Sequence, residues 1–450
     1  MKKIILVILS ALLIGIPTGV HAAELNDYTV QANGTSDVKI NLFDYWLQEG
    51  SDAVDPEGRE NFGINQNHLL LFHFLTQELI NGTNRIIKEF GRWNAWEEKE
   101  QWLPVTGMVE PVLDENGYPV LSIPEEEILA TNWLNTRKNE SLEYLFNPEI
   151  EIPYRKAYKN VKGLFQRSAN KGDYYSSYEN FAEYNQEKNQ FLLYNKPAIN
   201  GVRASGQFFP FNKGEEVFDI EETSNQLVAK NIDSNNEILN HYLGMTLEAK
   251  FTQPEKGQAQ NEETKQEQDM IFTFTGDDDI WIYIDNILVA DLGGIHNALT
   301  AEINFATGKI TIKPSDNTAI SSTTTKEYFL GDIYNKITAK YTEQYMKENF
   351  IKETDEKGTT TKYTFTDNST HTLKIFYLER GNTDSNLEAS FWPSINGDIN
   401  NEIETPPEQI VEEENPETND LFIVAICGIA ISILGVVAIA RFYKYKIKNT

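Results

Sequence analysis

Three consecutive aspartates, Asp277, Asp278 and Asp279, are the residues of this chain whose types and spacing best suit chemistry. They interrupt a stretch rich in β-branched and aromatic residues, which predicts that they lie at the mouth of a buried hairpin. Carboxylates held together in such a place repel one another and lose solvation. Their charge must be offset by a cation, an arginine or backbone N–H donors, and the residues alone leave these solutions open.

The elements that position the aspartates can be read from the residues on either side. Residues 280–284 (IWIYI) have bulky side chains at every position, as expected of a strand buried on both faces. Asp285-Asn286 is a pair that tolerates positive φ, so it predicts a tight turn. Residues 287–289 (ILV) then form the returning strand of the hairpin.

Two blocks of the sequence resemble a known family. Residues 276–296 (GDDDIWIYIDNILVADLGGIH) resemble the core motif of the fibro-slime domain, a relative of the protective-antigen-type β-sandwich of bacterial surface proteins and yeast-type lectins. Residues 373–391 (LKIFYLERGNTDSNLEASF) resemble the closing strand, loop and strand of the same family. The resemblance covers most of residues 200–395, and weaker pieces reach back to Phe43-Asp44-Tyr45. It implies a mainly β fold, a protective-antigen-type β-sandwich.

The resemblance also implies a calcium site. Asp277-Asp278 matches the aspartate pair of the calcium-dependent lectins, which is joined by a cis peptide bond, and a second loop adds Asn or Asp ligands. Calcium prefers six to eight oxygen ligands and tolerates irregular geometry. The alternative is that Arg380 neutralises the aspartates and that the Asn and Asp residues only build turns. The candidate metal ligands are Asp277, Asp278, Asp279, Asn382, Asp384 and Asn386.

The composition argues against several other classes of function. Lys and Arg total 39 against 68 Asp and Glu, a net charge of −29 that disfavours nucleic acid and anionic lipid as partners. The six histidines are scattered without zinc-site spacing, and there is no GxSxG, Walker-type loop or cysteine nucleophile. We therefore expect no enzyme, although a pair of carboxylates for glycoside hydrolysis depends on a separation in space that sequence does not give.

The N-terminus predicts export. Residues 1–22 have the positive start, apolar run and small residues of a secretory signal peptide. The one cysteine, Cys427, lies in the C-terminal apolar run, so the exported part can form no internal disulfide. A long exported chain without cysteines favours a bacterial origin.

The C-terminus predicts an anchor. Residues 396–418 form an acidic, proline-containing linker, and residues 421–440 are an uncharged stretch long enough to cross a bilayer as a transmembrane helix. A basic tail follows, which places the C-terminus in the cytoplasm. Residues 415–419 (NPETN), the span and the tail resemble a Gram-positive sortase signal. That resemblance implies cleavage between Thr418 and Asn419, release of residues 419–450 and linkage to peptidoglycan; the alternative is a plain membrane anchor.

Two helices and an additional β region complete the expected architecture. Residues 23–199 predict an N-terminal β-rich region before the fibro-slime domain at residues 200–395. The spacing of apolar residues predicts helices at residues 77–90 and, as an insertion, at residues 326–352. We expect a cell-surface binding protein, an adhesin or matrix component that recognises carbohydrate with calcium. A structural wall or pilus-like component is the second expectation, and a polysaccharide hydrolase is the third.

Overall fold

The computed structural model describes only part of the 450-residue chain. The described residues are 25–34, 38–45, 70, 75–80, 83–88, 107–122, 133–134, 139–195, 207–221, 226–230, 239–261, 263–294, 296, 298–315, 325–337, 341–379 and 385–395. The signal peptide, the linker, the sorting signal and the span at 421–440 lie outside them, as do Arg380, Asn382 and Asp384. Among the described residues, no helix combines the length and the apolar character needed to cross a membrane.

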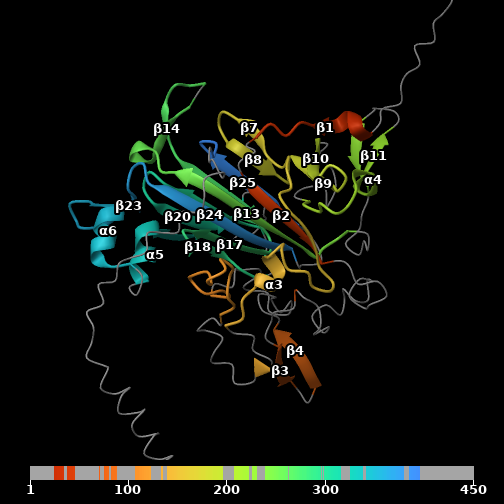
Figure 1. Ribbon diagram of the computed structural model, residues 1–450, viewed down its shortest axis with the longest axis horizontal. Coiled ribbons are helices and arrows are strands. Elements are labelled where there is room, and N and C mark those ends of the chain that lie inside the picture. Colours follow the sequence, from red (N-terminus) through yellow and green to blue (C-terminus); the bar gives the residue numbers. More distant parts are fainter. Residues whose placement is uncertain are drawn as a thin grey trace, which may run out of the picture. The chain divides into compact units, whose positions relative to one another are not determined.

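A six-stranded antiparallel sheet carries the hairpin that the sequence predicts (Figure 1). Its two longest strands, β13 and β24, pair over their whole length, from Leu243 opposite Glu379 to Thr252 opposite Thr370. In spatial order the strands are β18 (Ile287–Leu292), β17 (Asp279–Ile284), β24 (Thr370–Glu379), β13 (Leu243–Thr252), β2 (Lys39–Asp44) and β6 (Lys156–Tyr158).

A seven-stranded antiparallel sheet forms the second layer. Its central strand, β16, pairs with β19 on one side and β25 on the other. In spatial order the strands are β21 (Lys326–Phe329), β20 (Lys309–Pro314), β19 (Leu299–Asn304), β16 (Ile271–Gly276), β25 (Leu387–Trp392), β8 (Gly172–Ser176) and β7 (Gln166–Ser168). Strands from residues 23–199 and from residues 200–395 therefore share both sheets.

The main core lies between the two sheets. Alternate residues of β13 and β24, such as Met245 and Ile375, belong to the same buried cluster as Phe272 and Phe391 of the seven-stranded sheet. Because side chains alternate across a strand, one face of each sheet supplies this core. The molecule is thus a mainly β sandwich, as the sequence predicts.

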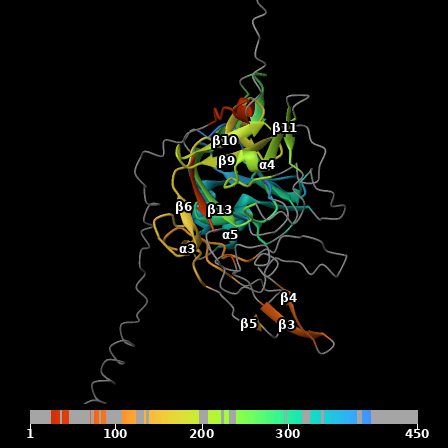
Figure 2. The ribbon, with the colours of Figure 1, turned by 90° about the vertical axis from the view of Figure 1, so that its right-hand side faces the viewer.

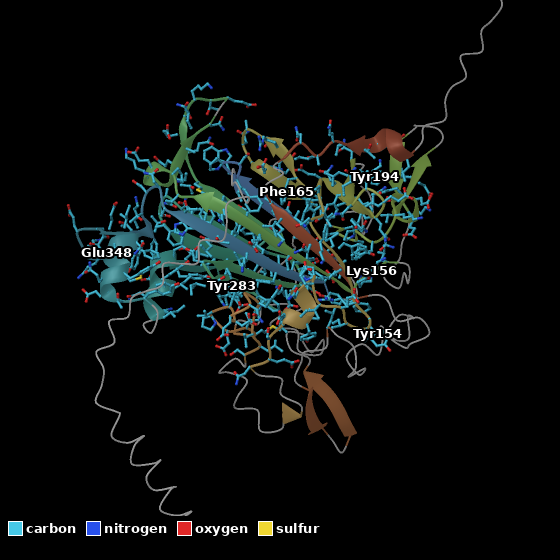
Figure 3. All side chains as sticks on the ribbon, in the orientation of Figure 1. Tyr154, Lys156, Phe165, Tyr194, Tyr283 and Glu348 are labelled. Carbon is cyan, nitrogen blue, oxygen red and sulfur yellow. The ribbon has the colours of Figure 1, made fainter. Side chains whose placement is uncertain are left out.

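The outer face of the six-stranded sheet is covered as well. Trp281 and Tyr283 of β17 and Phe376 of β24 belong to a second buried cluster with residues of the 107–150 segment, which includes the short helix α3 (Glu143–Phe146). The Tyr283 side chain is labelled in Figure 3. β17 is therefore buried on both faces, which explains its unbroken run of large side chains.

Smaller elements surround the sandwich. A third buried cluster, separate from the one that contains Phe165, joins Tyr194 of β10 to residues near α4 and β11 (Figures 2 and 3). The elements of this region are η1 (Leu25–Tyr28), β1 (Thr29–Val30), β9 (Asn180–Asn185), β10 (Gln190–Asn195), α4 (Gly214–Val217), β11 (Phe218–Glu221) and β12 (Gln226–Ala229). The remaining small elements lie outside this third cluster. They are two hairpins, β14 (Gln258–Gln260) with β15 (Glu267–Asp269) and β22 (Phe350–Thr354) with β23 (Thr360–Phe365), and the 3₁₀ turn η2 (Glu255–Gly257).

The helix expected at residues 77–90 is wrong. The chain there forms β3 (Leu75–Ile80) and β4 (Thr83–Lys88), which pair antiparallel, with β5 (Trp133–Leu134) beside β3. The dipeptide Asn81-Gly82 stands between the two strands. That dipeptide is a strong hairpin signal, and it outweighs the apolar spacing on which the helix was predicted.

The long helix expected at residues 326–352 is also wrong as a single element. The segment is divided into β21, α5 (Leu330–Lys336), α6 (Glu343–Asn349) and β22. The apolar stripe of Phe329, Ile333, Ile337, Tyr341 and Tyr345 nevertheless packs on the main core. The spacing thus identified the packing face correctly, and a helical insertion is present as two short helices.

Candidate functional site

Two crossovers between the sheets meet at one end of the sandwich. Asp277 and Asp278 connect β16 to β17, and residues 380–386 connect β24 to β25. The strand register brings the crossovers together, because Gly276 pairs with Leu387 and Asp279 pairs with Leu378. A Cβ atom on Gly276 would lie 2.3 Å from Cδ1 of Ile280. A larger residue at position 276 would therefore require the Ile280 side chain to move.

Three carboxylates converge where the crossovers meet. Asp277 and Asp278 approach Glu379, the last residue of β24, and one ligand oxygen from each lies within 4.8 Å of the others. All three side chains are buried, with relative exposures of 4%, 2% and 0%. We call Asp277, Asp278 and Glu379 the acidic cluster.

Glu379 is the member of the acidic cluster that sequence reasoning missed. Burial raises the pKa of its carboxyl group well above the ordinary value of 4.5, and the charges of Asp278 and Asp277 raise it further. The nearby Ser385 hydroxyl acts in the opposite direction and lowers this pKa. Either a proton or a cation at this carboxylate lowers the free energy of the cluster.

Asn386 links the second crossover to the acidic cluster. Its backbone N–H donates to Oδ1 of Asp277 at 2.8 Å, and its Nδ2 donates to Oδ2 of the same carboxylate. Its Oδ1 is buried and accepts no hydrogen bond from the described residues. A buried oxygen without a donor costs roughly 1–3 kcal/mol, so a cation coordinated by this oxygen would remove that cost.

Asp279 lies outside the acidic cluster, although the sequence suggested it as a ligand beside Asp277 and Asp278. It is the first residue of β17, and alternation along the strand turns it to the side of Trp281 rather than that of Ile280. Its Oδ1 accepts from the backbone N–H of Gly294 at 2.6 Å.

Of the three other expected ligands, only Asn386 belongs to the described residues. Asn386 contacts the cluster, whereas Asn382 and Asp384, together with the alternative neutralising residue Arg380, lie outside the described residues. The expected cis bond between Asp277 and Asp278 is absent, because the one cis peptide bond among the described residues joins Trp392 to Pro393.

A second polar constellation lies at the opposite end of the same strands. His371 of β24 contacts Asp285 through Nδ1 and Ser369 through Nε2, both at 2.7 Å. Asp285, His371 and Ser369 are the three residue types of a catalytic triad, connected in the same order. The Ser369 hydroxyl also donates to the carbonyl of Thr366 at 2.6 Å, so its single proton has two competing acceptors, this carbonyl and Nε2 of His371. A nucleophilic serine passes its proton to the histidine, whereas here the contacts of Ser369 and Asp285 join two turns through His371.

The acidic cluster fits a calcium ion. Two oxygens that bind one calcium at about 2.3–2.6 Å can be up to about 5 Å apart, which accommodates ligand atoms that lie within 4.8 Å of one another. The carboxylates of Asp277, Asp278 and Glu379 would supply the charge, and Oδ1 of Asn386 is available as a neutral ligand. A calcium ion would screen the mutual repulsion of the carboxylates.

The fold and this site define the class as a mainly β sandwich with a buried acidic cluster at the sheet crossovers. No family model matches the chain, and no solved structure matches it. Short segments are similar to proteins of Dictyostelium discoideum: 44% identity to psiO over 64 residues, 14% of this chain and 7% of psiO; 59% to psiR over 34 residues, 8% and 3%; and 49% to psiB over 47 residues, 10% and 8%. The chain therefore spans less than a tenth of these relatives.

Proposed function

We propose that this chain is a cell-surface binding protein in which the acidic cluster holds calcium and the ion's open positions bind carbohydrate. The observation that supports the proposal is the convergence of Asp277, Asp278 and Glu379 beside the unsatisfied Oδ1 of Asn386. Residues 276–296 and 373–391, which resemble the fibro-slime domain, supply the strands and crossovers that build this cluster.

Calcium would connect the cluster to a ligand. Three carboxylates and one amide oxygen leave part of a six- to eight-oxygen coordination shell to water or to ligand hydroxyl groups. The carboxylates are themselves shielded from solvent, so a sugar would be held by the ion's remaining positions. A few such contacts bury little surface, and affinity at one site would be weak.

Surface display would make weak binding useful. The signal peptide at residues 1–22 and the anchor at residues 415–450 support export followed by attachment to the wall or membrane. We place sortase cleavage between Thr418 and Asn419, with peptidoglycan as the acceptor. Many copies on one cell would then act together through avidity.

The proposal is tested with Asp278→Asn in the full-length chain, measured by calcium calorimetry and by glycan-array binding with and without calcium. Asp219→Asn is a matched control, because it removes an exposed carboxylate whose partner, Lys230, lies 3.5 Å away on the surface. We expect Asp278→Asn to lose calcium and calcium-dependent glycan binding and the control to keep both. A variant that loses calcium yet binds glycans normally would place the binding surface elsewhere.

A structural role is the second candidate, and the burial of the cluster favours it. Carboxylates at 4%, 2% and 0% exposure could hold an ion that only stiffens the sheet crossovers. In that case calcium would stabilise the fold, and no glycan would bind. The same pair of measurements separates the two functions, because only the first couples calcium to a ligand.

A further inference from the structure

The outer face of the six-stranded sheet is polar at one end. Glu248 of β13 lies directly opposite Lys39 of β2 on one side and Lys374 of β24 on the other. All three alternate with core residues along their strands, so their side chains leave the sheet on the face opposite the main core. The next row on this face is Asn41, Thr246 and Phe376, where the second apolar cluster begins.

A cavity of about 120 Å³ lies over this polar row. The turn at residues 114–118 and the segment after α3 form its other wall, through Asn116, Tyr118 and Pro148. Gly117 of the turn has φ +83°, and a Cβ atom there would lie 2.6 Å from Nζ of Lys374. Glycine at this position therefore leaves room for the Lys374 ammonium group in the cavity wall.

The charged groups of the polar row have no partners in the described part of the chain. Neither Lys39 nor Lys374 forms an ion pair or a side-chain hydrogen bond there, and the Glu248 carboxylate accepts none. The neighbouring Asn41, by contrast, is satisfied, because its Nδ2 donates to Thr246 and its Oδ1 accepts from the backbone of Asn160. The row thus presents two donors and one acceptor, in alternation, to whatever enters the cavity.

The alternation of charge decides which chemical class fits. An anion would meet Glu248 between the lysines, with Asp114 and Glu143 beside Tyr118, and a cation would meet both ammonium groups. Hydroxyl groups both donate and accept, so a neutral polyol can satisfy all three charges at once. The Tyr118 ring, which packs edge-on against Phe376 with centroids 6.4 Å apart, offers an apolar surface to the C–H groups of a sugar.

We propose that this cavity binds one neutral sugar unit without calcium. The site is distinct from the acidic cluster: Lys374 lies in the middle of β24 on the outer face, whereas Glu379 ends the strand on the core side. A cavity of about 150 Å³ holds one benzene-sized ring, and a hexose is larger than benzene, so the volume of about 120 Å³ would hold one face or edge of a single sugar ring while the rest extends through the entrance. Lys39 and Asn116 are exposed at the rim and leave the entrance open to solvent.

The test uses the full-length chain in a detergent without sugar head groups, with a chelator present throughout. Glucose, galactose, mannose and N-acetylglucosamine are the neutral probes, and glucuronate and sulfate are the anionic probes; saturation-transfer NMR measures their binding. We expect a neutral sugar to bind and Glu248→Ala or Lys374→Met to weaken it about tenfold or more, since each removes a charged hydrogen-bond partner. Glu353→Ala, a change of the same type at an exposed position of β22, should leave binding unchanged.

Three results would overturn the proposal: no bound probe, binding of the anions in place of neutral sugars, or neutral-sugar binding that survives in both cavity variants. Thermal unfolding of each variant confirms that it is folded, and the two substitutions at partly exposed positions serve as independent checks on each other. Asp278→Asn should bind the neutral sugar in chelator as the wild type does. The calcium-dependent function and this site can therefore fail separately.

Discussion

The two ends of the β17–β24 pair both carry carboxylates, but in opposite electrostatic arrangements. The strands run antiparallel, so the start of β17 and the end of β24 meet at the acidic cluster, while Asp285 after β17 meets His371 at the start of β24. We call the second arrangement the histidine end. At the histidine end one carboxylate faces donors alone, whereas at the acidic end three carboxylates face one another as well as donors from Asn386 and Tyr377.

This difference separates a contact that the chain completes by itself from a cluster whose carboxylates favour a proton or a cation. At the histidine end Oδ2 of Asp285 contacts the His371 ring at 2.7 Å, and its Oδ1 accepts from the backbone N–H of Thr372 at 2.9 Å. The chain itself supplies these donors. At the acidic end the three carboxylates need a proton or a cation between them, which makes the stability of that end depend on pH and on metal.

The largest effect is expected at the histidine end. His371→Ala removes both hydrogen bonds and the ring stacked on Phe365, with centroids 3.7 Å apart, and it leaves Asp285 without its partner. We expect a loss of about 3 kcal/mol in the free energy of unfolding, measured by urea denaturation. The loss should be the same with calcium and with chelator. A calcium-dependent loss would mean that the two ends are not independent.

At the acidic end, by contrast, we expect a substitution to raise the free energy of unfolding. In metal-free protein Glu379→Gln removes a buried group that repels its neighbours, so we expect a gain on the order of 1–2 kcal/mol near pH 8. Asp219→Asn provides the baseline for removing a surface carboxylate. A loss of stability at pH 8 would show that donors such as the Tyr377 hydroxyl outweigh the repulsion from Asp277 and Asp278.

The pH dependence of metal-free wild-type protein follows from the same group. The pKa of Glu379 is raised in the folded chain above its ordinary value of 4.5, so the folded state binds this proton more tightly than the unfolded state does. Stability from this group is therefore fully present below about pH 4.5 and is lost as pH rises through the raised pKa. Wild type and Glu379→Gln, unfolded side by side from pH 5 to pH 8, should diverge as pH rises. Parallel curves would contradict the raised pKa.

The smallest change in the free energy of unfolding is expected at Tyr377, which contacts both the acidic cluster and Ser385 of the second crossover. The Tyr377 hydroxyl donates to Oε2 of Glu379 at 3.3 Å and lies 3.1 Å from Oγ of Ser385. Tyr377→Phe keeps the buried ring and removes these contacts, so we expect a cost of about 1 kcal/mol. Ser369→Ala makes a comparable single deletion at the histidine end. If Tyr377→Phe were neutral and Ser369→Ala were not, the hydrogen bonds at the acidic end would be the weaker ones.

Local patterns in the sequence predicted the strands better than the contacts between them. The run at residues 280–284, its turn at Asp285-Asn286 and the need to offset Asp277 and Asp278 can all be recognised locally, and the positive φ angles of 50° and 66° confirm the turn. Glu379 could not be identified in this way. It joins the cluster only because Leu378 pairs with Asp279, a register set by the packing of the whole sheet.

The cavity on the outer face escaped prediction for the same reason. Lys39, Glu248 and Lys374 come from three distant segments, and only the pairing of β2, β13 and β24 places them in one row. The division of residues 326–352 into two helices also depends on context. The four-residue spacing predicted which side chains pack, but it did not show that Phe329 is extended and ends a strand before the first helix begins.

A calcium titration followed by thermal unfolding tests the central claim most directly, with wild type, Glu379→Gln and Ser369→Ala compared at pH 7.5. We expect calcium at a hundred times its dissociation constant to stabilise wild type and Ser369→Ala by about 2.7 kcal/mol, which corresponds to several degrees in melting temperature. Glu379→Gln should show little or no shift over the same titration. An unchanged melting temperature in wild-type protein verified to be metal-free at the start, or a full shift in Glu379→Gln, would contradict a calcium site at Asp277, Asp278 and Glu379.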